Sequence, residues 1–332
     1  MSVKALRRIQ CGHETTAGTA VAAVVIWRGL GVLEDGQVRE FPEEDIGYLM
    51  PSTRSYVPKE GASLAMEEVP ATFEQLPYIL SSSIENVHTA TADGAGSGYI
   101  YQYDFPITAA NAAPLTWTIE MGDDQRVDEM EYAFVEEFTL KGAAGEAVTV
   151  AATWQGRQAT DAEFTGSLTP IAVEEVLFSK GALWLDATGG TIGTTTKTQT
   201  WLGFEMTVPS GWMPVYTADG NLYFTFLKYT GNNPVTGTLL LEHDTTGEAE
   251  LGFARAGTVR LLQVRFTGAA LTTAGTSWTY KTLQAQFAIQ YTEVPSLDDQ
   301  DGNDVIELPW RQVYSDSIPG QIVVINSNST IA

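Results

Sequence analysis

Three histidines are the first candidates for acid–base or metal chemistry, because the imidazole pKa ordinarily lies near neutral pH. His13, His88 and His243 lie far apart in the sequence, and no two of them have the i, i+4 spacing of a helical metal site. Partners distant in sequence do converge in folded enzymes, so a metal triad or a Ser-His-Asp arrangement stays open. Each histidine stands in an irregular segment or a turn, which favours ordinary surface positions. No G-x-S-x-G nucleophile motif is present, and residues 61–65 are the nearest approach.

Two loops resemble ligand-binding motifs without completing them. Gly94–Gly98 is a small glycine-rich loop, yet it lacks the G-x-G-x-x-G spacing and the lysine of a phosphate-binding loop. Asp298–Asp304 has the carboxylates of a calcium loop, but alignment of Gly302 with the sixth position puts Leu297 where the first ligand is required. We therefore predict a loop tip and an acidic hairpin, with no metal and no cofactor.

Pairs of glutamates raise the alternative of a glycoside hydrolase, which needs two carboxylates across a sugar. Neighbouring residues on a strand point to opposite faces, so such pairs are more typical of one solvent and one interface position. A carbohydrate-binding or hydrolytic β-sandwich for host recognition stays open, with Trp212 and Trp278 as sugar platforms. We nevertheless predict that the protein is not an enzyme. The pairs are Glu43–Glu44, Glu67–Glu68, Glu136–Glu137 and Glu174–Glu175.

The chain is strongly acidic, with 41 Asp and Glu against 18 Lys and Arg and a net charge of −23. Charged residues are only 18% of the total, so the negative charge arises from a scarcity of Lys and Arg. This balance argues against a protein that grips nucleic-acid phosphates or anionic membranes, since both need basic surfaces. Acidic walls do, however, let a polyanion slide past without sticking.

Length and composition predict a folded chain of about two domains. Hydrophobic residues make up 44% of the 332 residues, which is enough for real cores. The single cysteine, Cys11, excludes an internal disulfide framework and zinc sites with several thiolates. The apolar stretch Ala17–Trp27 is too short to span a bilayer, and His13 and Glu14 interrupt the pattern of a signal peptide. A soluble intracellular chain is expected.

Period-two alternation of apolar and polar residues predicts a mainly β fold. Leu115, Trp117, Ile119 and Met121 point one way and their neighbours the other, as half-buried strands require. The other predicted strands are rich in aromatic or β-branched residues and bounded by turn formers. They are residues 99–105, 146–154, 221–227, 236–242, 258–266, 283–291 and 321–325.

Helical signals are few and short. Phe73, Leu76 and Leu80 share one helical face, although Pro77 limits that helix to about two turns. Gln125–Phe134 is a second candidate helix, with acidic residues near its start where they suit the dipole. Both are expected to act as lids on a β-sandwich or barrel.

The predicted organisation is an extended arm followed by two tandem β units. Residues 1–62 contain many turn formers and predict an arm with at most one or two strands. Residues 63–166 and 167–332 then form the two units, because strand, acidic turn and strand recur in 138–156 and 237–268. The small polar segments Thr89–Gly98 and Asp186–Thr198 are predicted surface loops.

The order of several short motifs resembles the major tail proteins, or tail tube proteins, of bacteriophages with long flexible tails. Each motif alone is weak, and their order along most of the chain makes the resemblance; it is weakest between Asp186 and Pro234. The motifs are Gly12–Ala20, Glu43–Gly47, Ala71–Leu80, Leu115–Glu120, Phe134–Val148, and Asp301–Gly302 followed by Val323–Asn326.

The resemblance implies β-sandwich tube domains, each with a helix, whose sheets join those of neighbouring copies around a central channel. Rings stack head to tail, with arms and loops reaching from one ring to the next. Two units in one chain imply a ring of three copies with pseudo-sixfold symmetry, alternatively of six. The implied partners are other copies, the tape measure protein, the tail terminator and tail tip proteins, and DNA in passage, with no membrane binding. The implied location is the virion tail, assembled in the host cytoplasm.

Two groups of residues are the candidate sites of such a structure. An acidic channel wall lets DNA pass without binding, although an outer-surface position suits each acid equally well. The arm segment is expected to order when rings stack. A tail terminator or baseplate ring component remains an alternative within the same setting. The candidate lumen acids are Glu120, Glu136, Glu137, Glu242 and Asp244, and the candidate assembly arm is Glu14, Thr15, Thr16, Gly18 and Thr19.

Overall fold

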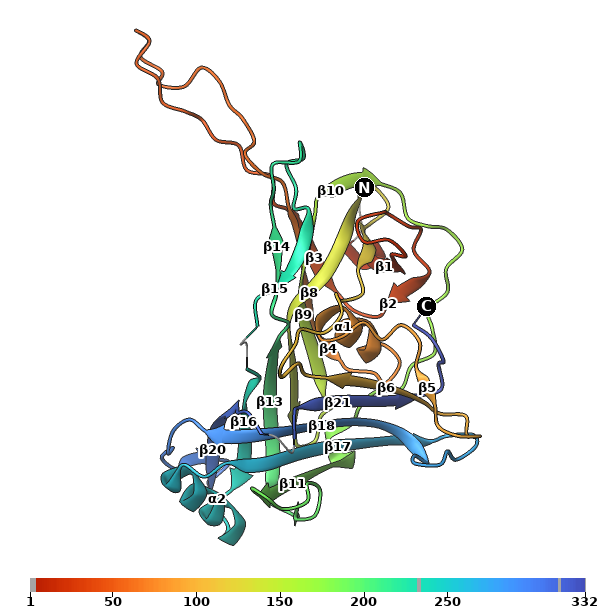
Figure 1. Cartoon of the computed structure of the whole chain (residues 1–332), viewed down its shortest axis with the longest axis vertical. Helices are drawn as coiled ribbons and strands as arrows, with labels where there is room; N and C mark the ends of the chain where they lie inside the picture. The colour runs from red at the N-terminus through yellow and green to blue at the C-terminus, as the bar shows by residue number, and fades with distance from the viewer. Residues whose placement is uncertain (1–3, 232–233, 316–317, 332) are drawn as a thin grey trace.

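The computed structural model describes residues 4–231, 234–315 and 318–331, and it confirms a mainly β fold with few short helices. The two α-helices of this part of the chain are α1 (Leu76–Ser83) and α2 (Thr245–Ala256). Neither is long and apolar enough to cross a membrane. Strands dominate all three views of the molecule (Figure 1).

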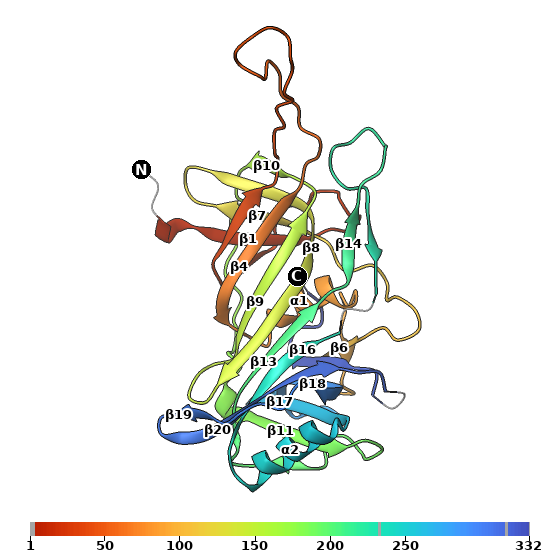
Figure 2. The same ribbon diagram turned by 90° about the vertical axis from the view of Figure 1, so that its left-hand side faces the viewer.

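A large antiparallel sheet runs through the whole molecule. Its central joint is the pairing of β8 with β13, which bonds Glu137–Ala143 to Gly203–Pro209. Figure 2 looks onto this sheet, with β4, β9, β8 and β13 side by side and α1 behind them. In spatial order the strands are β3 (Gly31–Asp35), β4 (Ala62–Pro70), β9 (Thr149–Gly156), the second half of β8 (Val127–Ala143), β13 (Trp201–Pro209), β16 (Thr236–Glu242) and β20 (Asn303–Gln312).

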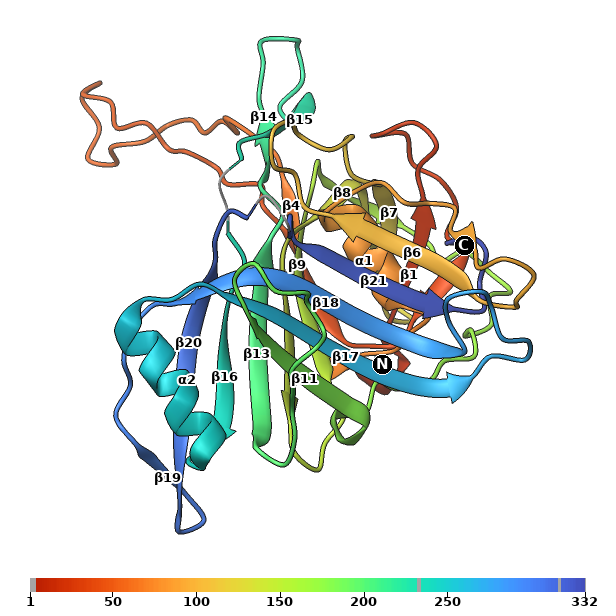
Figure 3. The same ribbon diagram turned by 60° about the horizontal axis from the view of Figure 1, so that its bottom comes forward.

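Two smaller layers cover the inner side of the large sheet, and Figure 3 shows β17 and β18 running across its strands. One layer contains β2 (Val25–Trp27), β1 (Arg8–His13), β7 (Trp117–Gly122), the first half of β8 and β10 (Ala159–Ala162). The other contains β12 (Thr196–Lys197), β11 (Gly181–Ala187), β17 (Arg260–Ala270), β18 (Tyr280–Tyr291), β21 (Gln321–Asn326), β6 (Tyr99–Asp104) and β5 (Thr91–Ala92).

The strand pairings occur twice along the chain in the same order. The pairs β1–β2, β1–β7, β3–β4, β4–β9, β7–β8, β8–β9 and β8–β10 recur as β11–β12, β11–β17, β13–β16, β16–β20, β17–β18, β18–β20 and β18–β21. Each set is preceded by a short 3-10 helix, η1 (Lys4–Leu6) or η2 (Phe178–Lys180), and contains one α-helix after its fourth strand position. The chain is therefore built as two similar units, with β8–β13 as the joint between them.

This repeat differs from the one expected from the acidic turns. Residues 138–156 form the β8–β9 hairpin, whereas 237–268 form β16, α2 and β17, so these two segments are not equivalent. The acidic stretch before residue 250 is the start of α2, capped by Asp244 and ended by Gly257 in the left-handed conformation (φ 61°). Three strands, β1, β2 and β3, lie within 1–62, so residues 8–35 belong to the first unit, and only residues 36–61 of the predicted arm protrude from it.

The two predicted helices have different outcomes. The first is present as α1, all of whose residues are buried between the layers, and Pro77 lies in its first turn, where no backbone N–H is needed. The second is wrong, because Gln125–Phe134 enters β8 at Val127. There β8 pairs with β7 on one side and β10 on the other, so two strand partners satisfy the backbone and override the helical pattern.

Each unit carries a long extension at the same topological position. Residues 36–61 lie between β3 and β4, and residues 210–231 follow β13, precede β16 and include the hairpin β14 (Trp212–Val215) and β15 (Phe226–Tyr229). Both project from the upper end of the molecule in Figures 1 and 2. A structural duplication thus extends to the parts that protrude from the fold.

A buried carboxylate fixes the bend where β8 passes from one layer to the other. Glu14 Oε1 accepts a hydrogen bond from the backbone N–H of Tyr132 (2.8 Å), a residue with a positive φ of 52°. Its carboxylate also accepts from Gly18 N (2.7 Å), Thr116 Oγ1 (2.8 Å) and Thr118 Oγ1 (3.1 Å). A single acidic side chain thereby holds the segment after β1, strand β7 and the β8 bend together.

We predict that Glu14→Gln lowers the free energy of unfolding by ~2–4 kcal/mol, because the amide cannot accept all four hydrogen bonds and leaves buried donors unpaired. Urea denaturation followed by tryptophan fluorescence measures the change. The matched control is Glu137→Gln, at an exposed position, for which a change below ~0.5 kcal/mol is expected. Equal effects of the two substitutions would contradict the anchoring role.

Candidate functional site

The outer face of the large sheet is an open polar surface. Along each strand apolar side chains turn inward, as Leu64 and Met66 do on β4 and Leu239 and Leu241 on β16, and the alternate residues turn outward. Many of the outward residues are threonines, and Thr139 and Thr207 form a hydrogen bond across the β8–β13 joint (3.0 Å between the Oγ1 atoms). The outward threonines are Thr139, Thr149, Thr153, Thr207, Thr236 and Thr238.

This open face has a net negative charge. Its acidic positions come from β3, β4, β8, β13, β16 and β20, so they are spread across both units. Lys141 faces Glu205 across the β8–β13 joint, and Arg311 lies opposite Thr236. Among the described residues of the strands of the large sheet, these two are the only basic residues at outward positions. The acids are Glu34, Glu67, Glu137, Glu205, Glu242 and Glu307.

Three of the five predicted lumen acids lie on or beside this face. Glu137 and Glu242 alternate outward from β8 and β16. Glu136 is exposed at the bulge of β8 and accepts a hydrogen bond from Gln155 Nε2 (2.7 Å). Glu205 and Glu307 were not among the predicted lumen acids. Each lies between two inward apolar residues, and this alternation in the sequence could have identified them.

The other two predicted lumen acids do not point outward from a strand of this face. Glu120 is only 2% exposed, and its carboxylate accepts hydrogen bonds from Thr165 N (2.7 Å) and Ala23 N (3.4 Å), so it is an internal anchor. Asp244 is the N-cap of α2 and accepts from Thr246 N (2.7 Å) and Gly247 N. Both carboxylates therefore accept hydrogen bonds from backbone N–H groups of their own chain.

The predicted assembly arm is divided between anchoring and exposed residues. Glu14 is buried, and Gly18 (φ 76°) lies against Arg157, where an added Cβ would meet the guanidinium. Thr15, Thr16 and Thr19 are exposed. Of the five predicted arm residues, the three threonines are therefore the ones exposed to another molecule.

The first extension exposes large apolar side chains to solvent. Glu40 and Tyr56 pair as a backbone bridge and through their side chains (2.6 Å), and Arg54 forms an ion pair with Glu44 (2.8 Å), so the ribbon has internal order. None of residues 41–50 is buried, and Leu49 is fully exposed. Exposed apolar side chains at this density mark a contact surface. They are Val38, Phe41, Ile46, Tyr48, Leu49, Met50 and Tyr56.

The histidines provide no catalytic constellation. His13 and His88 stack with ring centroids 4.3 Å apart, and burial together with the neighbouring His88 lowers the pKa of His13. His243 lies 3.3 Å from Glu248, at the start of α2. Within the described ranges no three His, Cys, Asp or Glu side chains are grouped so that they could hold a metal ion.

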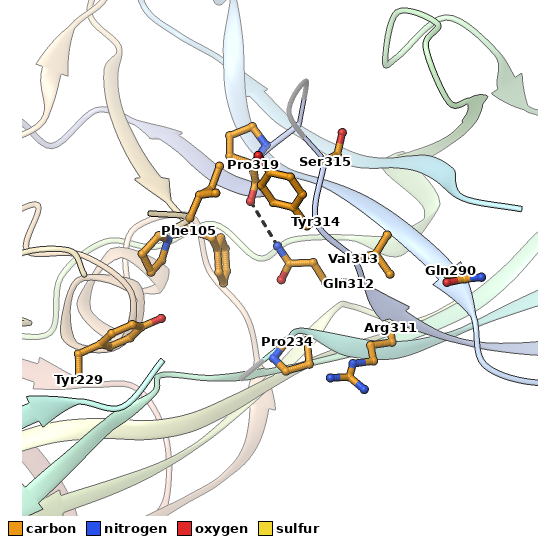
Figure 4. Close-up of a pocket in the computed structure, with 12 residues that line it drawn as sticks. Phe105, Tyr229, Pro234, Gln290, Arg311, Gln312, Val313, Tyr314, Ser315 and Pro319 are labelled. Carbon is orange, nitrogen blue, oxygen red and sulfur yellow. Dashed lines mark hydrogen bonds between the residues drawn. The ribbon is translucent and has the colours of Figure 1, made fainter. Parts of the chain in front are cut away.

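A pocket beside β20 has few groups that could take part in catalysis. It encloses about 490 Å³ beside β20 and contains Phe105, Tyr229, Pro234, Gln290 and Arg311 among its lining residues (Figure 4). Of the lining residues that the structure describes, Arg311 alone carries a charge. None of the described residues that line it is a carboxylate, thiol or imidazole, so these residues provide none of the usual acid–base groups.

The tryptophans proposed as sugar platforms are not free. Trp212 is 7% exposed and packs against Tyr229 (5.2 Å between centroids). Trp278 is half-buried, with the Arg265 guanidinium 5.4 Å from its ring centroid. The acidic hairpin prediction is confirmed, since β19 (Asp298–Gln300) pairs with the start of β20 through a turn at Asp301–Gly302.

No family model matches the chain, and no curated protein matches its sequence. The open face, the extensions and the edges of the sheet are the features of the molecule that point to a function.

Like charges gather on the outer side of the β7–β8–β10 layer. Glu120 and Glu129 are directly opposite on β7 and β8, and Glu131 follows two residues later on β8. Burial, followed by the charges of Glu120, Glu131 and Glu14, raises the pKa of Glu129. A raised pKa in the fold means that the folded state keeps a proton that the unfolded chain releases, so stability falls as pH rises through that range.

We predict that Glu129→Gln raises the melting temperature at pH 7, because it removes a charge that burial and its neighbours oppose. The gain should shrink toward about pH 4, where the wild-type carboxyl is protonated in both states. Thermal unfolding at the two pH values measures it, with Glu146→Gln, at an exposed turn position, as the control. A gain that is independent of pH would exclude the electrostatic explanation.

Proposed function

We propose that this protein is a structural subunit that assembles into rings and stacks them into the tail tube of a long-tailed bacteriophage, with the open face of the large sheet lining the channel. The observation that carries the proposal is the duplication of the fold around one continuous sheet. A sheet that already joins two similar units side by side within one chain is suited to continue in the same way between chains.

The free edges of the large sheet support lateral association. Among the described strands, β3 pairs with β4 alone, and the outer edge of β19 pairs with nothing. Unpaired edges of long sheets are templates for pairing with another chain, and closure into a barrel removes them. Three copies with two units each give a ring of six similar units.

The extensions support axial association. Both project from the same end of the molecule, and both carry exposed apolar side chains, including Leu49 in the first and Met213 and Phe226 in the second. A contact between one end of a copy and the other end of the next is heterologous, and such contacts generate open filaments. Two extensions per chain give each ring six contacts to the next.

The charge of the open face supports a channel for nucleic acid. Six acids and two bases alternate outward from the strands of the large sheet, with threonines between them. DNA carries a dense negative charge, so an acidic polar wall repels it and provides no cation to bind its phosphates. Such a wall suits passage rather than retention.

Negative-stain microscopy of the purified protein at high concentration tests the proposal. We expect tubes of uniform diameter whose end-on averages show three copies and six similar lobes. Single rings that never elongate would favour a terminator or baseplate ring component. Protein that stays monomeric across salt, pH and concentration would contradict the proposal.

We predict that replacement of residues 41–50 by a short Gly-Ser linker abolishes tubes and leaves rings, because the exposed apolar tip makes the axial contact. The melting temperature should stay within about 2 °C of wild type, since no buried residue is removed. Sedimentation velocity and microscopy measure assembly. The milder variant Leu49→Ser/Met50→Ser keeps the ribbon length and should reduce tube length; tubes of normal length in both variants would contradict the role.

We predict that tubes of Glu137→Lys/Glu205→Lys/Glu307→Lys retain double-stranded DNA, whereas wild-type tubes do not. Retention should fall steeply between about 50 and 200 mM salt, as expected for phosphate neutralisation. Co-sedimentation of DNA with tubes provides the measurement. A variant with the same charge change elsewhere, Asp124→Lys/Glu163→Lys/Glu175→Lys, is the control, and equal retention by both variants would show that the open face does not line the channel.

A further inference from the structure

The two unpaired edges of the large sheet have matching apolar character. On the β3 edge Leu30 and Val32 are exposed (53% and 47%). On the other edge, the ribbon from Tyr291 to Gln300 exposes Val294 and Leu297 (46% each). These four side chains lie beside free backbone edges, where an added strand would bury them.

The joint inside the chain shows how such edges fit together. At that joint β8 pairs with β13 over seven residues, and the turn after β8 rests on the segment before β11. Ala147 forms a bridge with Leu177, and the Phe178 N–H donates to the Glu146 carbonyl (3.2 Å). A pocket of about 420 Å³ lies there, and Gly145 of the turn forms part of its wall.

The repeat gives each part of this joint a counterpart at the free edges. Strand β3 has the place of β13, and the ribbon 291–300 has the place of the second half of β8. Helix η1 and the start of β1 have the place of η2 and the start of β11. A second pocket, of about 100 Å³, lies at this position and includes Arg7, Arg8 and residues 29–32 in its lining. The counterpart of the β8–β9 turn is the β19–β20 turn, at the opposite edge of the chain.

The charges of these counterparts are complementary. Residues 293–307 contain six acidic residues and no basic one. Arg7 and Arg8 are exposed, and the Arg8 guanidinium lies 4.0 Å from the centroid of the Phe164 ring, which holds it beside the pocket. In the described residues no ion pair involves either arginine. The chain has 41 acids and only 18 bases, so two adjacent arginines outside any ion pair form an unusual basic site on its surface. The six acids are Glu293, Asp298, Asp299, Asp301, Asp304 and Glu307.

We infer that the acidic hairpin Asp298–Asp304 of one copy docks in the Arg7/Arg8 pocket of a second copy, with its ribbon paired to the free edge of β3. The inference rests on the proposed ring and names the contact that closes it. Burial of the apolar edge residues supplies the adhesion, and the arginine–aspartate contacts select this partner edge and speed its encounter.

The repeat also fixes the register of the new pair. Trp154 lies opposite Val135 and Trp310 opposite Tyr291, each just past the crossing of the layers, so the two tryptophans are equivalent. Five residues before each tryptophan, Thr149 faces Lys141 and Val305 faces Asp298. Asp298 is therefore the counterpart of Lys141.

The cross-strand pairs of the two units also identify the residue that should lie opposite Asp298. In the second unit, one row across the sheet runs from Lys141 through Glu205 and Thr238 to Pro309. In the first unit, the matching row runs from Val32 through Ala65 to Thr153. The two rows are equivalent because Pro309 and Thr153 each directly precede one of the equivalent tryptophans. Val32 is therefore the counterpart of Glu205, and it should lie opposite Asp298 of the neighbouring copy.

Oxidation of the full-length double variant Val32→Cys/Asp298→Cys tests this register. Residues directly opposite in a sheet are within reach of a disulfide, so we expect a ladder of covalent oligomers on non-reducing gels that collapses to monomer with reductant. The native Cys11 is buried, and burial raises the pKa of its thiol to about 12, so it does not compete. The control is Val32→Cys/Asp299→Cys, in which the second cysteine points to the other face of the strand.

A second variant tests the charge contact. Arg7→Glu/Arg8→Glu should abolish the ladder in the double-cysteine background, and Asp299→Arg/Asp301→Arg added to it should restore the ladder. Absence of cross-links in the double-cysteine protein, or equal cross-linking of the control, overturns the inference. If tubes form without these cross-links, the proposed function stands and the joint lies elsewhere; if neither tubes nor cross-links form, both are wrong.

Discussion

The unpaired backbone edges of the large sheet are the constraint on which the rest of the structure depends. Each strand must satisfy its N–H and C=O groups, and the chain solves this internally by joining its two units at β8–β13. The same solution is not available within one chain for β3 and the β19 ribbon. An assembly that repeats the internal joint satisfies those edges, which makes the folded chain an incomplete part of a larger barrel.

The small number of basic residues has one consequence on the open face and another at the sheet edge. On the open face it leaves acids such as Glu137 and Glu307 with few cations nearby, which suits a wall that a polyanion must pass. At the sheet edge it makes Arg7 and Arg8 distinctive, since few other cations compete for an acidic hairpin. The net charge of −23 therefore has different consequences on the open face and at the sheet edge, and these depend on where the charged residues lie.

The fold class was predictable because alternation is local, whereas the joints between strands were not. Strands Trp117–Gly122 and Tyr280–Tyr291 lie where the alternation predicted strands, although loops and neighbouring layers bury the polar face as well as the apolar one. Gln125–Phe134 was predicted as a helix because its partners β7 and β10 are distant in sequence, and pairing with both decides its state. Glu120 and Asp244 were predicted as wall residues because no pattern reveals the backbone donors that surround them. The duplication was visible only once strand order was known.

Native mass spectrometry of the assembled ring measures the central claim most directly. The internal joint and the free edges predict a closed ring of three chains of 35.9 kDa each, which persists when the axial extension is shortened. The ring should fall apart when Val32→Asp places a like charge opposite Asp298 of the neighbouring copy. A ring of six chains would contradict the account, as would a chain that remains monomeric, because in either result the two units would not be acting as neighbouring members of one barrel.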